Sequence, residues 1–282
     1  MISFCLFASF LVLSSQGDDS IKSADSPTVP QIPIRPAQDQ PGSNFHEAGI
    51  FFCQIPKNGA TIMQIILCDL FRYYKGIPFK VEYGQGKQSS NCQAEGWYKK
   101  LSGIRSQNNT WEPNQEDTLI AVIRHPLKRF LSLYRYLCEQ LQMCGSANIH
   151  EFTKDVYTLL TTRSIHGTHF KDSDQKIVEY HAQPQTWFCI LSHNSQKFHL
   201  IRNEGDRLAM HSELKTAFEE AKVPKFYSDQ VLFHVVYSDT AHANKDKDRT
   251  KQLETSFTQN PLSMTYFNAI YYKDFELFGY QK

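Results

Sequence analysis

The segment GIFFCQIPKNGATIMQIILCDLF, residues 49–71, constrains the fold of this chain more than any other part of it. Residues 49–55 form a nearly continuous apolar run, which is typical of a strand buried on both faces of a sheet. After Pro56, the stretch 61–74 has helical periodicity, with one apolar face made of Met63, Ile66, Leu67, Leu70 and Tyr74. A buried strand that passes through a tight turn into a helix predicts the start of a layered α/β fold.

The same pattern returns at residues 118–124, TLIAVIR, where His125 and Pro126 follow a second apolar strand. Pro126 fits the first position of a helix, and apolar residues then recur at helical spacing as far as Leu141. Further predicted elements are helices at 150–163 and 206–222, a short strand at 198–202, and a helix with an extended end at 261–280. Together they predict a three-layer α/β fold with a mainly parallel central sheet.

The chain outside this pattern divides into segments of distinct composition. Residues 1–17 carry an apolar run that predicts a cleaved signal peptide, with a short signal anchor as the alternative. Residues 18–45 are rich in Pro, Ser, Asp and Gln, and we expect an extended tether rather than a packed unit. Residues 46–282 form the predicted globular domain, in which the polar stretch 76–117 is expected to be loops that cover a cleft.

A secretory signal gives the cysteines and one asparagine a specific meaning. Six cysteines remain if Cys5 leaves with the signal, and an even number in this context predicts disulfides: Cys53, Cys68, Cys92, Cys138, Cys144 and Cys189. Cys138 and Cys144 could close a small loop after a helix, which leaves Cys68 with Cys92 and Cys53 with Cys189 as the remaining guess. A zinc site would need closely spaced cysteines such as Cys-x-x-Cys, and the chain has no such pair, so we favour disulfides over zinc. Asn108, in the sequon Asn-Asn-Thr, is the expected glycosylation site.

The net charge limits the classes of ligand that the whole surface could attract. Thirty Lys and Arg residues nearly balance twenty-nine Asp and Glu residues, for a formal charge of +1. This balance argues against a general nucleic-acid or membrane-surface binder, and we expect membrane contact only if the first segment is an uncleaved anchor. An anionic ligand must therefore be met by a local group of residues.

Two turns of the predicted sheet have the properties of such a local anion site. In open parallel sheets, ligands bind at the carboxyl ends of strands, where turns lead into helix N-termini. The turn from Lys57 to Thr61 can aim backbone N–H groups and a helix dipole at a phosphate, and Gly59 permits close approach. The second turn places the Arg124 guanidinium at the end of the neighbouring strand, while Arg129 and Ser132 follow on the helix face away from the apolar stripe. Two anion sites predict a ligand with two separated anionic groups.

The two turns together resemble a known family. IPKNGAT and VIRHPLKRFLSLYR are similar to the 5′-phosphosulfate loop and the 3′-phosphate segment of luminal carbohydrate sulfotransferases, in the forms P-K-x-G-x-T and R-x-P-x-x-R-x-x-S-x-Y. YHAQPQTWFC (180–189), SDTAHAN (238–244) and YYKDFELFGY (271–280) resemble the chondroitin-type branch that is expanded in nematodes. The resemblance covers most of residues 49–280 and implies a P-loop-like sulfotransferase fold.

The resemblance also implies a donor and the residues that hold it. The donor cosubstrate would be 3′-phosphoadenosine 5′-phosphosulfate, used without a metal ion. Lys57 would contact the oxygen that bridges phosphate and sulfate, and Arg124 with Ser132 would hold the 3′-phosphate. The 5′-phosphate would be cradled by Asn58, Gly59, Ala60 and Thr61. Because Lys57 precedes the glycine, the loop lacks the spacing of a nucleoside-triphosphate site, which disfavours magnesium-dependent phosphoryl transfer.

The base that accepts the proton of the acceptor hydroxyl is the least defined residue. His181 is the first candidate, because imidazole titrates near neutral pH and because Pro184 and Trp187 suggest a structured binding loop; a structural histidine is the alternative. His242 is the second candidate. His125 lies between Arg124 and Pro126, where it suits turn formation better than a role as the base. Two carboxylates in the covering loops, Glu82 and Glu95, are further candidates for the base.

The resemblance favours a glycosaminoglycan or other glycan acceptor in the Golgi lumen or at the Golgi membrane, with secretion as an alternative. Family members usually have a long type II anchor, whereas this chain starts with a short apolar run. An anionic polymer could contact Lys99, Lys100, Arg105, Lys245, Lys247, Arg249 and Lys251. Two other classes are considered. A metal-dependent kinase or glycosyltransferase would need a D-x-D pair, and Asp172 and Asp174 have that spacing but lie in a polar loop without a preceding buried strand, which argues against this class. The other class is a catalytically inactive secreted glycan-binding protein on the same fold.

Overall fold

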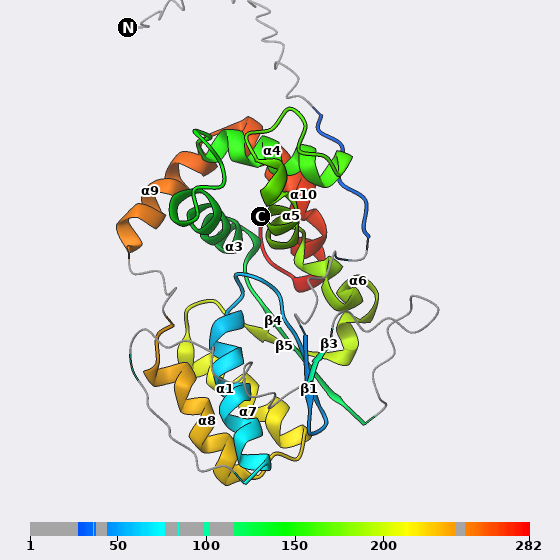
Figure 1. The fold of residues 1–282 in the computed structure, drawn as a ribbon, viewed down its shortest axis with the longest axis vertical. Helices are drawn as coiled ribbons and strands as arrows, with labels where there is room; N and C mark the ends of the chain where they lie inside the picture. The colour runs from blue at the N-terminus through cyan, green and yellow to red at the C-terminus, as the bar shows by residue number, and fades with distance from the viewer. Residues whose placement is uncertain are drawn as a thin grey trace, which may run out of the picture.

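The computed structural model describes residues 28–35, 37, 44–76, 84, 99–101, 116–240 and 246–282. Over these residues the chain forms one sheet between two layers of helices (Figure 1). The strand order is β3-β1-β2-β4-β5. The strands are β1 (Asn44–Glu47), β2 (Ile50–Cys53), β3 (Lys99–Leu101), β4 (Thr118–Ile123) and β5 (Phe198–Arg202).

The sheet has a parallel part and an antiparallel edge. β2 pairs with β4, and β4 with β5, in parallel, as the two strand–turn–helix patterns predicted. β1 joins β2 in an antiparallel hairpin through Ala48 and Gly49, whose φ angles of 51° and 73° suit a two-residue hairpin turn. β3 pairs with β1 at the outer edge. The expectation of loops throughout 76–117 was therefore wrong at residues 99–101, where pairing with β1 overrides a polar local sequence.

The residues of β2 and β4 alternate between two cores, because successive side chains of a strand point to opposite faces. Phe51 and Ala121 face one core, and Phe52 and Ile120 face the other. The second face is covered by α1 (Ala60–Tyr74), α7 (Arg207–Glu220) and α8 (Lys225–Tyr237). The first is covered by α3 (Pro126–Tyr134), α4 (Ile149–Thr162), α5 (Gln175–Ala182), α6 (Leu191–Asn194), α9 (Lys247–Thr258) and α10 (Pro261–Phe278). Figure 1 shows the two layers above and below the sheet, and the predicted three-layer fold is confirmed.

Short helical turns complete the layer on the first face. A π-helix, Arg135–Gln140, extends α3, and 3-10 helices span Asp172–Asp174, Gln185–Ile190 and Ser195–Lys197. α3 begins where Pro126 predicted and continues through the π-helix, but Leu141 is 41% exposed rather than part of the apolar face. The change from α to π geometry rotates the residues after Tyr134 away from the extrapolated 3.6-residue stripe.

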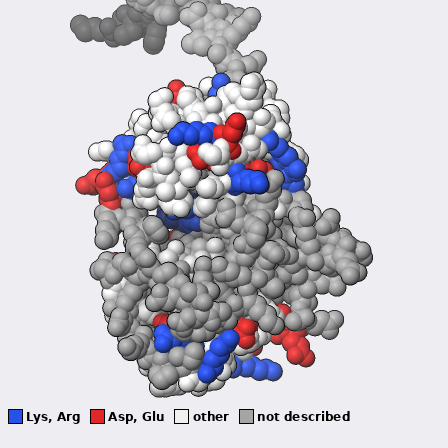
Figure 2. Space-filling view, viewed as in Figure 1, with Lys and Arg blue, Asp and Glu red and all other residues white. Residues whose placement is uncertain are grey.

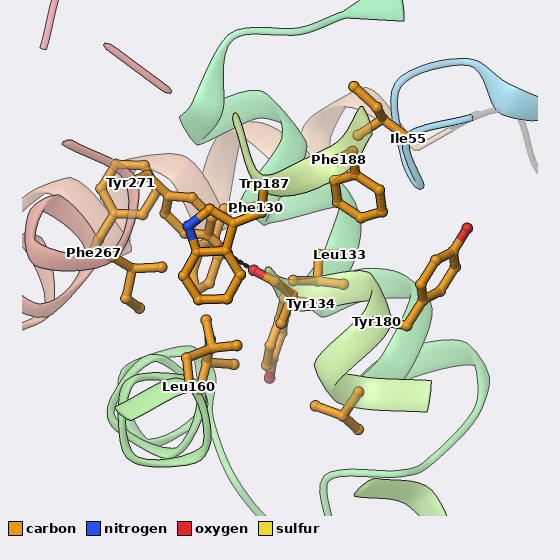
Figure 3. Close-up of a cluster of buried hydrophobic side chains, with 14 of the residues drawn as sticks. Ile55, Phe130, Leu133, Tyr134, Leu160, Tyr180, Trp187, Phe188, Phe267 and Tyr271 are labelled. Atoms are coloured by element: carbon orange, nitrogen blue, oxygen red, sulfur yellow. Dashed lines mark hydrogen bonds between the residues drawn. The ribbon is translucent and has the colours of Figure 1, made fainter. Parts of the chain in front are cut away.

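An aromatic cluster fills the core among the helices α3, α4, α9 and α10, which cover the first face of the sheet. The Phe130 ring lies 5.4–5.8 Å from the rings of its aromatic neighbours, which are Phe152, Phe257, Phe267 and Tyr271. Trp187 belongs to the same cluster and is only 4% exposed (Figure 3). The sequence suggested that Trp187 marks a binding loop, and this was wrong: its indole is a core side chain.

The described part of the expected tether is extended, but it packs on the domain. Ile32 is 2% exposed, and its N–H donates to the carbonyl of Ala269 in α10 at 3.1 Å. The N–H of Ala37 donates to the carbonyl of Trp187 at 3.0 Å. Composition alone missed this packing because a few contacts, made by Ile32 and Ala37, anchor a segment that has no apolar periodicity of its own.

The predicted disulfides are present where the structure describes both partners. Cys53, the last residue of β2, is bonded to Cys189, and Cys138 is bonded to Cys144. Cys68 is also disulfide-bonded, and its predicted partner Cys92 lies outside the described residues. Residues 1–17, with Cys5, also lie outside them, as do Glu82, Glu95, Arg105, Asn108, His242 and Lys245. In the described ranges no helix has the length and apolar character needed to span a membrane.

Candidate functional site

Both predicted turns open on one cleft at the carboxyl ends of the parallel strands. The cleft has a volume of about 660 Å³. Lys57, Gly59, Ala60 and Thr61 line it from the first turn, and Arg124 and Ser132 from the second. Tyr136 and His181 line it from the helical layer on the first face, and Asn203, Arg207, Ser238 and Asp239 from the other side. The structure thus brings together the groups that the sequence predicted as two parts of one anion site.

The first turn is shaped by two residues with left-handed backbone. Lys57 has φ 68° and Gly59 has φ 96°. A Cβ atom on Gly59 would lie 2.9 Å from Nδ2 of Asn203, which donates to the carbonyl of Asn58 at 3.2 Å. α1 begins at Ala60, so the N–H groups of its first turn have no partner within the helix. The turn therefore presents free backbone donors and a helix N-terminus to the cleft.

The side chain of Asn58 points into the protein, which differs from the predicted phosphate cradle. Asn58 is 1% exposed, and its Nδ2 donates to the carbonyl of Val122 at 2.8 Å and to Oε1 of Gln185 at 2.6 Å. Its backbone N–H points to the carbonyl of Ile55, at 3.4 Å. Asn58 therefore fastens the first turn to β4 and leaves the cleft to its neighbours.

Lys57 is held in an environment that disfavours its own positive charge. Its Nζ lies 4.0 Å from the centre of the Tyr136 ring, a residue of the π-helix. Burial, and then the nearby guanidinium groups of Arg124 and Arg129, lower the pKa of Lys57 to about 8. An anion in the cleft would relieve both effects, because it supplies the opposite charge that the site lacks.

Side chains hydrogen-bond the backbone of the second turn at Arg124 and His125. The N–H of Arg124 donates to Oε1 of Gln185 at 3.0 Å, and the carbonyl of Arg124 accepts from Nε2 of the same glutamine at 2.8 Å. The N–H of His125 donates to Glu204 at 2.7 Å, and its Nδ1 accepts from the N–H of Leu127 at 3.2 Å. His125 thus caps α3, as its position in the turn predicted.

The guanidinium of Arg124 is the group that this turn offers to the cleft. Its Nη1 donates to the carbonyl of Lys57 at 3.0 Å, which ties the two turns together. Its Nε is buried without a hydrogen-bond partner, and burial lowers the pKa of Arg124. An orphaned, desolvated guanidinium N–H is a donor suited to an anionic oxygen.

Arg129 is buried beneath the first turn, which the sequence did not predict. We expected it on the outer face of the helix, but it is 1% exposed. Its Nε donates to the carbonyl of Pro56 at 3.1 Å, its Nη2 donates to that of His181 at 2.9 Å, and it also hydrogen-bonds the hydroxyl of Tyr271. A guanidinium tolerates burial when its donors find oxygen acceptors. Arg129 therefore braces the first turn from below, whereas Ser132, one turn further along α3, lines the cleft.

His181 lies in the last turn of α5 with one ring nitrogen already committed. Its Nδ1 lies 2.8 Å from the carbonyl of Ile177, and because a carbonyl only accepts, Nδ1 carries the proton. In the neutral ring, Nε2 then carries a lone pair and can accept a hydrogen bond. Burial, with further contributions from Lys57 and Arg129, lowers the pKa of His181 to about 4 despite the bond to Ile177. The imidazole is thus neutral at physiological pH.

Gln185 and Asp274 are site residues that sequence reasoning missed. The Gln185 amide joins the Asn58 side chain to the backbone of Arg124, and it is 0% exposed. The Asp274 carboxylate accepts from the backbone N–H groups of Gln185 and Thr186, each at 2.9 Å. Both residues lie inside segments that the family resemblance singled out, which was the available signal. Their roles depend on backbone contacts across 89 residues, and no local pattern reveals such contacts.

The charged surface agrees with the near-neutral composition. Figure 2 shows basic and acidic side chains interspersed on the described part of this face, with basic atoms in the recess between the two halves. Among the basic residues proposed for acceptor binding, Lys247 lines the cleft, while Arg249 is paired with Glu139 at 2.8 Å. Asp172 and Asp174, considered for a metal site, lie in a 3-10 helix and are not part of the cleft lining.

The fold and the cleft define an α/β protein with two turns that present the cationic side chains of Lys57 and Arg124 to one cleft. A family model described as the sulfotransferase family matches residues 45–281. The match covers most of the chain, so the chain belongs to the sulfotransferase family, which supports a sulfotransferase activity. No curated protein and no solved structure matches the chain.

Proposed function

We propose that the protein is a carbohydrate sulfotransferase that moves the sulfuryl group of 3′-phosphoadenosine 5′-phosphosulfate to a hydroxyl of a glycosaminoglycan, of the chondroitin type. The observation that carries the proposal is the pairing of Lys57 and Arg124 on one cleft, joined by the bond from Arg124 Nη1 to the Lys57 carbonyl. A nucleotide with phosphate groups at the 3′ and 5′ positions has the two separated anions that these turns require.

The residues present fit this donor. The α1 N-terminus and the glycine turn can accept the 5′-phosphate through backbone N–H groups of Gly59, Ala60 and Thr61. The unpaired Nε of Arg124 and the hydroxyl of Ser132 suit the 3′-phosphate. Lys57, which is desolvated and close to both sites, suits the bridging oxygen that leaves with the nucleotide.

The proposed reaction is an in-line displacement at sulfur. The acceptor oxygen forms a bond to sulfur while the bond from sulfur to the bridging oxygen breaks, and the electron pair stays on the departing phosphate. The Lys57 ammonium is strongest as a stabiliser when that negative charge has built up, so we expect it to act on turnover more than on donor binding. We propose that His181 orients or deprotonates the acceptor hydroxyl through Nε2, because its Nδ1 is already bonded to the Ile177 carbonyl.

The acceptor and the cellular site are proposed from weaker support. The family resemblance favours a glycan, and Lys247 and Arg207 add positive charge to the cleft wall. The disulfides and the apolar first segment support a luminal protein, in the Golgi or secreted. A secreted glycan-binding protein without activity, on the same fold, is the second candidate.

The first test is calorimetric titration with adenosine 3′,5′-bisphosphate, the product of the donor. We expect specific binding by the wild type and at least about tenfold weaker binding by Arg124→Ala, since a charge-assisted contact is lost. Arg249→Ala is the matched control, because this arginine is paired with Glu139 and does not line the cleft. Absence of binding by the folded wild type would refute the proposal, and labelled transfer to unsulfated chondroitin separates the enzyme from the inactive alternative.

A further inference from the structure

A second hydrogen-bonded chain reaches the cleft from the other face of the sheet. His234, on α8, is 2% exposed, and its Nε2 lies 2.8 Å from Oδ2 of Asp69 on α1. Its Nδ1 lies 2.9 Å from Oγ of Ser238, the residue that follows α8. Ser238 is 4% exposed and lines the cleft. The carboxylate, imidazole and hydroxyl therefore form a line from the core to the site.

The chemistry of the partners assigns the protons along this line. An ionised Asp69 can only accept, so Nε2 of His234 carries the ring proton and Nδ1 is a lone pair. The Ser238 hydroxyl then donates its hydrogen to Nδ1. One lone pair of the same Oγ accepts the N–H of Gly84, at 3.3 Å. A second lone pair of Oγ remains for a donor in the cleft.

The backbone around Ser238 is held in place independently. Arg207, from α7, donates from Nη1 to the carbonyls of Val236 at 3.0 Å and of Ser238 at 3.4 Å, and its Nη2 pairs with Asp239. The segment that carries the hydroxyl is therefore anchored at its main chain. The side chain of Ser238 is left with its bonds to His234 and Gly84.

We propose that this line is the proton acceptor for the acceptor hydroxyl, an inference that rests on the proposed transferase function. As the acceptor oxygen bonds to sulfur, its proton passes to Oγ of Ser238, and the Ser238 proton passes to Nδ1 of His234. The resulting imidazolium lies against the Asp69 carboxylate, and it returns its proton to solvent through the same hydroxyl after product leaves. Ser238 would be the catalytic residue, with His234 and Asp69 positioning its proton.

The geometry explains why this route would serve better than His181. Burial makes a charged His181 imidazole costly, and the nearby positive charges of Lys57 and Arg129 add to that cost, although the hydrogen bond to the Ile177 carbonyl partly offsets it. His234 is backed by a carboxylate, which stabilises the charge that proton transfer creates. His181 would then contribute a hydrogen bond that orients the acceptor.

The decisive variant is Ser238→Ala, assayed with labelled donor and unsulfated chondroitin, with bisphosphate affinity measured in parallel. We expect kcat to fall by about 100-fold, while the Kd for adenosine 3′,5′-bisphosphate and the melting temperature stay near wild type. Ser238→Thr, which keeps a hydroxyl, should recover most of the activity. Ser228→Ala is the matched control, since this serine lies on α8 with an unpartnered hydroxyl away from the cleft. Asp69→Asn should lower kcat similarly, because an amide can donate to Nε2 and reverse the ring tautomer.

The outcomes separate the two proposals. An active wild type with an equally active Ser238→Ala overturns the proton relay and leaves the transferase function standing. A higher bisphosphate Kd in Ser238→Ala with unchanged kcat makes Ser238 a donor contact and also overturns the relay. A wild type that binds the bisphosphate but transfers nothing to any glycan overturns both.

Discussion

The turns after β2 and β4 have the same place in the fold but offer the ligand different groups. The turn after β2 has left-handed residues at Lys57 and Gly59 and leaves the first N–H groups of α1 open. In the turn after β4, the backbone of Arg124 is closed off on both sides by Gln185. We therefore expect the first turn to bind its ligand group with the main chain and the second turn to bind with one side chain.

Under the proposed function, this difference would let one cleft hold two anions without a large positive surface. Backbone donors and a helix N-terminus carry no net charge, so the first site needs a single lysine. The second site depends on one guanidinium whose direction is set by its bond to the Lys57 carbonyl. Substitutions in the two turns should therefore change different quantities: turnover for the side chain of Lys57, and bisphosphate affinity for the side chain of Arg124.

The largest effect is expected at Lys57, where the change tests chemistry rather than binding. Lys57→Ala should lower kcat by about 1,000-fold, since charge on the bridging oxygen loses its counterion, while bisphosphate affinity changes only a few-fold. Steady-state transfer assays and calorimetry on the same preparation check this. A wild-type rate in this variant would show that the first turn has no catalytic role.

The second prediction concerns Arg129, which we expect to stabilise the fold beneath the first turn rather than to bind the ligand. Arg129→Met removes the donors that satisfy the carbonyls of Pro56 and His181, and we expect a loss of about 3 kcal/mol in the free energy of unfolding. Arg249→Met is the exposed control and should change stability by less than about 1 kcal/mol. Denaturant titration measures both. Equal stability of the two variants would contradict the structural role of Arg129.

Gln185 should link the two turns energetically. Gln185→Leu keeps the volume but leaves buried partners on Asn58 and Arg124 unpaired, which should cost about 2 kcal/mol of stability and weaken bisphosphate binding. A double-mutant cycle with Asn58→Ala tests the link, because residues in one network are not additive. Strict additivity of the two changes would mean that the turns are independent.

The smallest effect is expected at Gly59, where one added methyl group changes the backbone freedom and the contact with Asn203. Gly59→Ala places a Cβ at 2.9 Å from Asn203 Nδ2 and forces alanine into φ 96°, at a cost of about 1 kcal/mol. The melting temperature should fall by a few degrees, and bisphosphate binding should weaken with it. Gly76→Ala, also at positive φ but with nothing near its Cβ, is the control that isolates the contact with Asn203.

The sequence predicted those features that depend on local patterns. The buried strands, the turns and the helices after them follow from apolar periodicity and from Pro126, and the cleft follows from the rule that parallel strands end together. It misplaced Arg129, Asn58 and Trp187. Each of these side chains is buried, although the local sequence pattern did not predict it. The residues around each side chain come from segments that are distant in the sequence, so a local pattern cannot show the burial.

The layers of the fold, the two turns and the cationic residues that they carry can be read from the local sequence. Which polar side chains support the cleft, and which face it, depends on how distant segments pack together. Asp69, His234 and Ser238 come from α1, α8 and the residue after α8, and Gln185 meets Asp274 across 89 residues. Local periodicity records which face of a helix is apolar, but a hydrogen bond depends on where two chain segments meet in space.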